Sequence, residues 1–172
     1  MTYHKKLLVT GLVCLVFFAA FIESSYAAWG SKELDTEKIA VQFAREVVKG
    51  GYKIVSTEEL KGWIDQKKDM LIVDTMPYED SYKKQHVPGA AQLEFPIKEL
   101  SSLDDKTKAE LEKLLGKNKD RLIVFYCGFT KCGRSHNGAM WAVTLGYKNV
   151  YRYPGGITGW SEADYPVEKV NK

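Results

Sequence analysis

The chain has 172 residues, of which 45% are hydrophobic and 27% are charged. This length accommodates one domain with a hydrophobic core, and the sequence has neither repeats nor low-complexity segments, which excludes solenoid and disordered classes. A formal net charge of +3 is too small to indicate binding to nucleic acid or to a membrane surface.

The N-terminal segment has the organisation of an export signal. Residues 4–6 form a basic start, residues 7–22 form an apolar run, and residues 25–27 (SYA) supply the small residues that a signal peptidase reads. We therefore predict that residues 1–27 are a signal peptide, cleaved after Ala27, and that the mature protein is periplasmic or secreted. The alternative is an uncleaved anchor, which is the only way in which we expect the chain to contact a membrane.

The predicted mature chain keeps two cysteines, Cys127 and Cys132, and has 23 cationic and 21 anionic side chains, a net charge of +2. Because exported proteins fold in an oxidising compartment, a disulfide between the two cysteines is one interpretation. Such a bridge would close a short loop, which stabilises a fold less than a long-range bridge does. A redox-active pair is therefore the other interpretation.

Residues 33–49 are predicted to form a helix, because apolar residues recur there at near-helical spacing before Gly50-Gly51 ends the pattern. We assign residues 28–51 to an N-terminal helical extension. The main domain is then expected to span residues 52–172.

The main domain is predicted to alternate strands and helices. A short strand is expected at residues 52–55, followed by a helix whose N-cap is Ser56 and whose capping-box partner is Glu59. Continuous apolar runs at 70–73 and 122–126 are typical of parallel strands that are covered on both faces.

Further elements follow the same order and predict an α/β domain with a mostly parallel sheet flanked by helices on both faces. They are a short helix at 79–85, a turn at 86–90, a helix at 104–115, a helix at 135–145, a strand at 150–153 and a turn at Gly155-Gly156.

The segment CGFTKCGRS, residues 127–135, is called the cysteine loop below. It follows a predicted strand and leads into a helix, which is where ligands bind in parallel sheets. Inward-facing backbone N–H groups, the helix N-terminus, and the cations Lys131 and Arg134 would each favour the thiolate of Cys127. The sequence therefore predicts that Cys127 is a nucleophile in an anion-binding loop.

Other groups near the cysteine loop have less specific interpretations. Cys127 and Cys132 can be combined with His136 and His86 into a metal site, but their Cys-x4-Cys spacing does not match the usual zinc pairs. We expect no metal and no cofactor. His136 falls in a first helical turn and is expected to face solvent, with proton transfer as the alternative; His86 and Asp74 are expected to be structural.

From about residue 54 to residue 160, the chain resembles a single-domain rhodanese, which is a sulfurtransferase fold. The combination of a cysteine loop between the motifs HVPGA and GGITGW is specific. The matching segments are VSTEEL at 55–60, LIVDT at 71–75, HVPGA at 86–90, VFYCGFTKCGRS at 124–135 and LGYKNVYRYPGGITGW at 145–160.

This resemblance implies that Cys127 takes a sulfane sulfur from a donor such as thiosulfate or polysulfide, becomes a persulfide, and passes the sulfur to a thiophilic acceptor. The partners so implied are a small sulfur-containing anion and an envelope redox or sulfur-acceptor protein. Arg134 matches the arginine that closes the loop. The residues whose backbone amides would surround the sulfur are Gly128, Phe129, Thr130, Lys131, Gly133 and Ser135.

The cysteine loop departs from the usual rhodanese pattern, Cys-x-x-x-x-Arg. Six residues separate Cys127 from Arg134, Cys132 is an additional thiol, and Met76 stands where an arginine is frequent. These departures leave two alternatives, a non-catalytic binding or sulfur-carrier module and a dithiol oxidoreductase that uses both cysteines. A phosphatase is less expected, because the loop length fits that related branch no better and no acidic proton donor stands out.

Overall fold

The computed structural model describes residues 32–170. The predicted signal peptide lies outside these residues, so cleavage after Ala27 stays a prediction. The chain divides after Lys38 into two units, and residues 32–38 are the described part of the first. Within the described range, no helix combines the length and the apolar character that crossing a bilayer requires.

The second unit contains a five-stranded, all-parallel sheet with the strand order β1-β5-β4-β2-β3, which confirms the α/β prediction. The strands are β1 (Lys53–Ile54), β2 (Met70–Asp74), β3 (Ala91–Gln92), β4 (Leu122–Tyr126) and β5 (Val150–Tyr153). The helices are α2 (Glu33–Gly50), α3 (Thr57–Asp65), α4 (Asp105–Leu115), α5 (Arg134–Thr144) and α6 (Gly156–Glu162), together with a π-helical turn, η1 (Tyr78–Tyr82).

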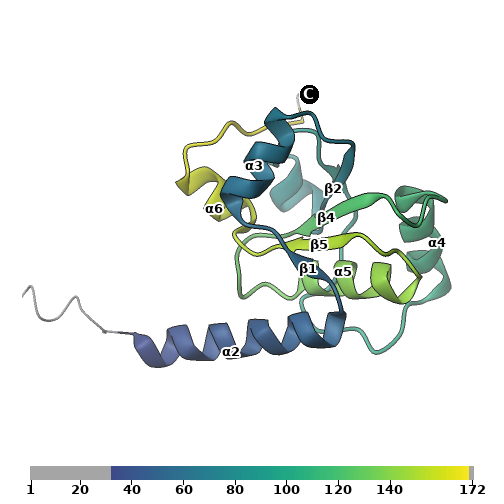
Figure 1. Ribbon diagram of the computed structural model, residues 1–172, viewed down its shortest axis with the longest axis horizontal. Helices are drawn as coiled ribbons and strands as arrows, with labels where there is room; N and C mark the ends of the chain where they lie inside the picture. The colour runs from purple at the N-terminus through teal and green to yellow at the C-terminus, as the bar shows by residue number, and fades with distance from the viewer. Residues whose placement is uncertain (1–31, 171–172) are drawn as a thin grey trace, which may run out of the picture. The chain divides into compact units, whose positions relative to one another are not determined.

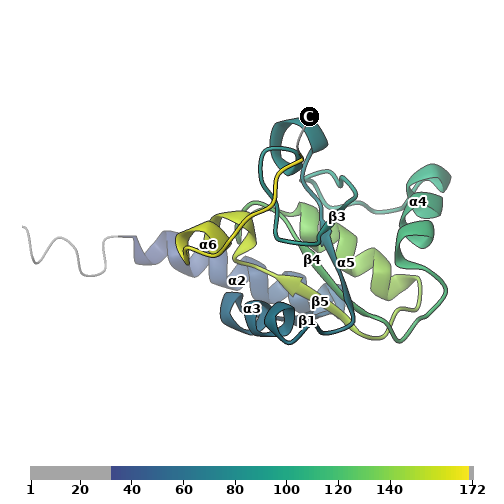
Figure 2. The same ribbon diagram turned by 90° about the horizontal axis from the view of Figure 1, so that it is seen from above.

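Helices cover both faces of this sheet, with α3 and α6 on one side and α4 and α5 on the other (Figures 1 and 2). The alternation of side chains along β4 explains why. Ile123 and Phe125 pack in the cluster that contains α4 and α5, whereas Val124 and Tyr126 pack in the cluster that contains α3 and α6. A strand that is apolar at every position therefore ends deep in the domain, and Cys127 follows it directly.

The predicted capping box at the start of α3 is confirmed. The Ser56 hydroxyl accepts a hydrogen bond from the Glu59 backbone N–H at 3.2 Å, and the Glu59 carboxylate accepts one from the Ser56 N–H at 2.9 Å. The helix start that the sequence indicated is therefore fixed by two reciprocal bonds.

Three elements differ from the sequence prediction. The expected helix at 79–85 is the π-helical turn η1, in which the Tyr82 N–H bonds the Pro77 carbonyl five residues before it at 3.1 Å. The expected turn at Gly155-Gly156 continues into α6, which buries Ile157 and Trp160. Strand β3 was not predicted, because its two residues form a strand only by pairing with β2.

Candidate active site

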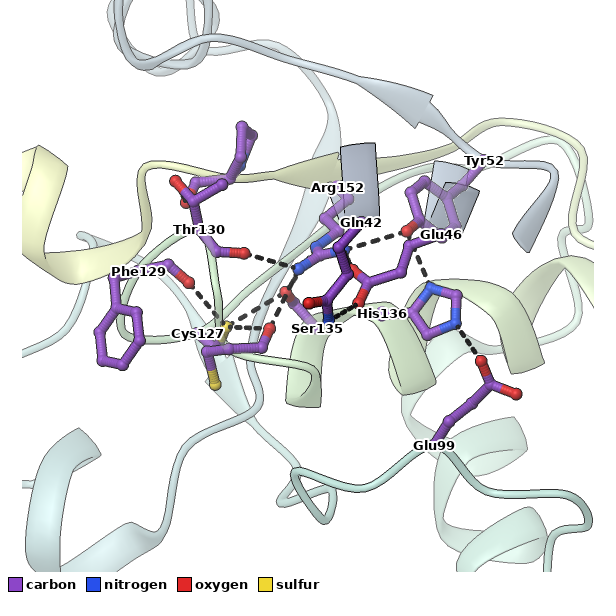
Figure 3. A network of polar contacts seen from close by, with 12 residues as sticks. Gln42, Glu46, Tyr52, Glu99, Cys127, Phe129, Thr130, Ser135, His136 and Arg152 are labelled. Atoms are coloured by element: carbon purple, nitrogen blue, oxygen red, sulfur yellow. Dashed lines mark hydrogen bonds and ion pairs between the residues drawn. The ribbon is translucent and has the colours of Figure 1, made fainter. Parts of the chain in front are cut away.

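Cys127 lies at the carboxyl end of β4, where the cysteine loop begins, and the last two residues of the loop form the start of α5. The side chains of Cys127 and Cys132 are both nearly inaccessible, with 2% and 7% of their surfaces exposed. Both are free thiols in this structure. Figure 3 shows the polar groups near Cys127.

Helix α6 holds the first peptide groups of the cysteine loop. The carbonyl of Cys127 accepts a hydrogen bond from the Ile157 N–H at 2.9 Å, and the carbonyl of Gly128 accepts one from the Thr158 N–H at 3.0 Å. Gly156 allows this approach, because its φ is +61° and an added Cβ would overlap the Cys127 carbonyl oxygen. In a planar trans peptide the N–H points opposite to the carbonyl, so the Gly128 N–H is turned away from α6.

The Cys132 thiol receives the inward-facing backbone donors. Its pKa is lowered to about 6, first by a hydrogen bond from Cys127 and then by the backbone N–H groups of Arg134 and Gly128, with the Arg134 charge acting in the same direction. These contacts favour the thiolate form of Cys132.

The surroundings of Cys127 favour the neutral thiol. Its sulfur lies 3.2 Å from the Cys132 carbonyl oxygen and 3.7 Å from that of Phe129, and a carbonyl can accept a hydrogen bond from S–H but repels S⁻. Burial, followed by the contact with Cys132, raises the pKa of Cys127 well above its ordinary value. The prediction that the loop favours the Cys127 thiolate was therefore wrong for the free protein, because burial outweighs the stabilisation that the loop gives to a negative charge on this sulfur.

Ser135 opposes this effect. Its hydroxyl lies 3.2 Å from the Cys127 sulfur, and the hydroxyl and the backbone N–H of Ser135 both lower the pKa of Cys127. Of the residues that the sequence placed around the sulfur, Ser135 is therefore the one that stabilises a negative charge on Cys127.

Arg134 does not extend its guanidinium toward Cys127. The guanidinium donates hydrogen bonds to the Glu94 carboxylate at 3.1 Å and to the Phe95 carbonyl. Its side chain therefore ties the start of α5 to the segment that follows β3.

The remaining residues of the cysteine loop are placed as follows. Phe129 and Lys131 are exposed, and the Thr130 hydroxyl donates to a backbone carbonyl beyond the end of β5. Gly133 precedes α5 and lies so close to the Ile97 carbonyl that a side chain would overlap it. These residues shape the loop, and their side chains have no contact with the Cys127 sulfur among the described interactions.

The most extensive set of contacts in the site comes from Arg152 on β5, which the sequence analysis did not single out. This arginine is completely buried, on the α5 side of the sheet (Figure 3). The only signal in the sequence is a charged residue within the short strand VYRY. Arg152 donates to the Ser135 hydroxyl at 2.9 Å, to the Cys132 and Thr130 carbonyls at 3.0 and 3.2 Å, to the Glu46 carboxylate at 2.5 Å and to the Tyr52 hydroxyl at 3.1 Å.

His136 is buried, so the prediction that it faces solvent was wrong. Its Nδ1 lies 2.9 Å from the Tyr52 hydroxyl and its Nε2 lies 3.2 Å from the Glu99 carboxylate. Arginine has no acceptor, so Tyr52 accepts from Arg152 and its own proton is left for His136 Nδ1. The neutral imidazole therefore carries its proton on Nε2 and donates it to Glu99.

This arrangement predicts a loss of stability at acidic pH. Burial lowers the pKa of His136 below its ordinary 6.5, although the carboxylates of Glu46 and Glu99 oppose the shift. As the pH falls through about 6.5, the unfolded chain binds a proton that the folded chain does not, so the free energy of unfolding decreases. Denaturant unfolding at about pH 7.5 and about pH 5.5 measures the difference, and His136→Gln should reduce it. An unchanged difference in the variant would assign the effect to other groups.

His86 and Asp74, which were expected to be structural, both contact backbone groups. His86 Nδ1 lies 2.8 Å from the Tyr82 carbonyl, and the Asp74 carboxylate accepts from the Met76 N–H at 2.8 Å. Among residues 32–170, no group of three or more His, Cys, Asp or Glu side chains has an arrangement that could hold a metal ion.

Comparison with known proteins gives consistent results. The family model described as Rhodanese-like domain matches residues 56–163. The thiosulfate sulfurtransferase GlpE of Coxiella burnetii is 30% identical over 123 residues, which cover 70% of this chain and 97% of that protein.

Two solved structures show the same fold. The polysulfide-sulfur transferase homodimer of Wolinella succinogenes is 16% identical, with 80% of this chain and 92% of that chain covered and a TM-score of 0.56. The thiosulfate sulfurtransferase of Pseudomonas aeruginosa is 18% identical, with 73% of this chain and 22% of that chain covered and a TM-score of 0.56.

Proposed function

Because the chain belongs to the rhodanese-like domain family, we propose that it is a sulfurtransferase that carries a sulfane sulfur as a persulfide on Cys127. The observation that carries this proposal is the position of Cys127, a buried free thiol at the carboxyl end of a central parallel strand. Its sulfur lies 3.2 Å from the hydroxyl of Ser135, at the start of α5. The name of the Coxiella burnetii relative supports thiosulfate as one donor.

The reaction begins with removal of the Cys127 proton. The proton passes to water, and the hydroxyl and the backbone N–H of Ser135 stabilise the resulting thiolate. The Cys127 thiolate then attacks the outer sulfur of thiosulfate, a new S–S bond forms, and the old S–S bond breaks as sulfite leaves with the electron pair. A thiophilic acceptor removes the outer sulfur and regenerates the Cys127 thiolate.

The sequence also supports a cellular setting for this reaction. We propose that the protein acts in the cell envelope or outside the cell after loss of residues 1–27, whose pattern indicates export. The acceptor would be a small thiol, cyanide, or an envelope redox or sulfur-acceptor protein.

Mass spectrometry of the reduced protein after exposure to thiosulfate or polysulfide tests the proposal. We expect the peptide that contains Cys127 to gain one sulfur atom, and thiosulfate to release an equal amount of sulfite. A stable Cys127–Cys132 disulfide without a sulfur adduct would instead support the dithiol oxidoreductase. Tight partner binding that survives Cys127→Ser, with no adduct in the natural protein, would support the carrier or binding module.

A further inference from the structure

Helix α2 reaches the candidate site although it lies before the residues that match the family model, which begin at 56. The Glu46 carboxylate of α2 accepts a hydrogen bond from Arg152 Nη1 at 2.5 Å. The ring of Phe43, one turn earlier, lies 4.9 Å from the guanidinium carbon of Arg152. Residues from outside the family-matched segment thus hold the buried cation behind the cysteine loop (Figure 3).

Arg152 determines which way the Ser135 hydroxyl points. Its Nε donates to Ser135 Oγ at 2.9 Å, and arginine cannot accept a hydrogen bond. The hydroxyl proton of Ser135 is therefore free to be donated to the Cys127 sulfur, 3.2 Å away. A hydroxyl that donates stabilises a thiolate or a persulfide anion relative to the protonated form.

The other arm of the same guanidinium holds the middle of the cysteine loop. Nη2 donates to the Cys132 carbonyl at 3.0 Å and to the Thr130 carbonyl at 3.2 Å. The Cys132 carbonyl oxygen is also the one that lies 3.2 Å from the Cys127 sulfur. Arg152 therefore draws electron density from the carbonyl that would otherwise repel an anionic sulfur most strongly.

The charge of Arg152 has one acidic partner among residues 32–170, which is Glu46. Arg152 is completely buried, so its charge cannot be balanced by water. Glu46 offsets the charge when the sulfur is neutral, and it limits how strongly Arg152 attracts an anion at Cys127.

We propose that Arg152 is a positioning residue for sulfur transfer, which aims the Ser135 hydroxyl at Cys127 and fixes two loop carbonyls, with Glu46 of α2 as its counter-ion. The proposal rests on the function proposed above. It assigns α2 a role in setting the charge of the cysteine loop. It also predicts that loss of the Ser135 hydroxyl and loss of the Glu46 charge shift the titration midpoint of Cys127 in opposite directions.

The test measures the rate of Cys127 alkylation by iodoacetamide as a function of pH, in a Cys132→Ser background so that one loop thiol titrates. Ser135→Ala should move the midpoint to higher pH and slow alkylation at pH 7 about tenfold, because one hydrogen bond to the anion is lost. Glu46→Gln should move the midpoint to lower pH, because the unbalanced guanidinium then favours an anionic sulfur.

A matched control is Glu37→Gln, which removes one carboxylate from an exposed position of the same helix and should leave the midpoint unchanged. Ser135→Thr keeps the hydroxyl and should restore the midpoint toward that of the parent. Two results would overturn the proposal. One is a midpoint that moves in the same direction in Ser135→Ala and Glu46→Gln. The other is a midpoint that does not move in these variants although their near-ultraviolet circular dichroism shows native packing.

Alkylation requires no sulfur donor, so this result is independent of the proposed function. Opposite shifts of the midpoint, together with sulfur transfer that survives Cys127→Ser, would leave the effect of Arg152 on the Cys127 sulfur in place and overturn the proposal that Cys127 carries the persulfide.

Discussion

Replacement of Cys127 by serine is expected to lower kcat/KM for sulfur transfer from thiosulfate or polysulfide by at least about a thousandfold. A serine hydroxyl cannot take up a sulfane sulfur to form a persulfide, so the covalent intermediate is lost while the fold is retained. Formation of thiocyanate from thiosulfate and cyanide measures the rate. Thermal unfolding of the variant checks that it is folded, so that the loss of activity can be assigned to the missing thiol.

Cys132→Ser is the matched comparison, because it removes the second thiol of the same loop. We expect the Cys127 persulfide to form in this variant, because Cys127 is retained and a contact that raises its pKa is removed. If Cys132→Ser abolished transfer while Cys127→Ser retained it, the roles assigned to the two cysteines would have to be exchanged.

Gly156→Ala is expected to have the largest effect on stability, a decrease of about 3 kcal/mol or more in the free energy of unfolding. The φ of Gly156 is +61°, and an added Cβ would overlap backbone atoms of Cys127 and Gly128. Backbone cannot move aside as a flexible side chain can. The substitution should therefore also displace the nucleophile and slow sulfur transfer. Denaturant unfolding measures the stability, and the thiocyanate assay measures the rate.

Gly116→Ala separates the two causes of this loss. Gly116 also has a positive φ, +76°, but nothing lies within 4 Å of an added Cβ at the end of α4. We expect the free energy of unfolding of Gly116→Ala to decrease by about 1 kcal/mol, with no change in the rate of sulfur transfer. Equal losses in both variants would mean that the contact between Gly156 and the cysteine loop contributes nothing to stability.

The sheet could be predicted because its signals are local. The apolar runs that became β2 and β4 identify strands covered on both faces, and Ser56 with Glu59 marks a helix start within four residues of chain. The position of Cys127 follows from the end of β4 alone. Short elements such as β3 carry no such signal, because they depend on a neighbouring strand.

The electrostatics of the site could not be predicted because they depend on distant residues. Glu46 and Arg152 are 106 residues apart in the chain, and nothing in either local pattern indicates the pair. Tyr52 and His136 are 84 residues apart. The protonation of Cys127 likewise depends on which loop peptides turn their carbonyls inward, and that is decided by contacts with α6 and β5.

The anchoring of the cysteine loop at both ends has a consequence for how such sites diversify. Helix α6 fixes the peptides after β4, and the close contact of Gly133 with the Ile97 carbonyl fixes the approach to α5. Residues 129–132 span the distance between these two points of contact, so the length of this stretch can change without displacement of Cys127. The second thiol, Cys132, lies within this stretch, so its position can vary with loop length while Cys127 stays at the end of β4.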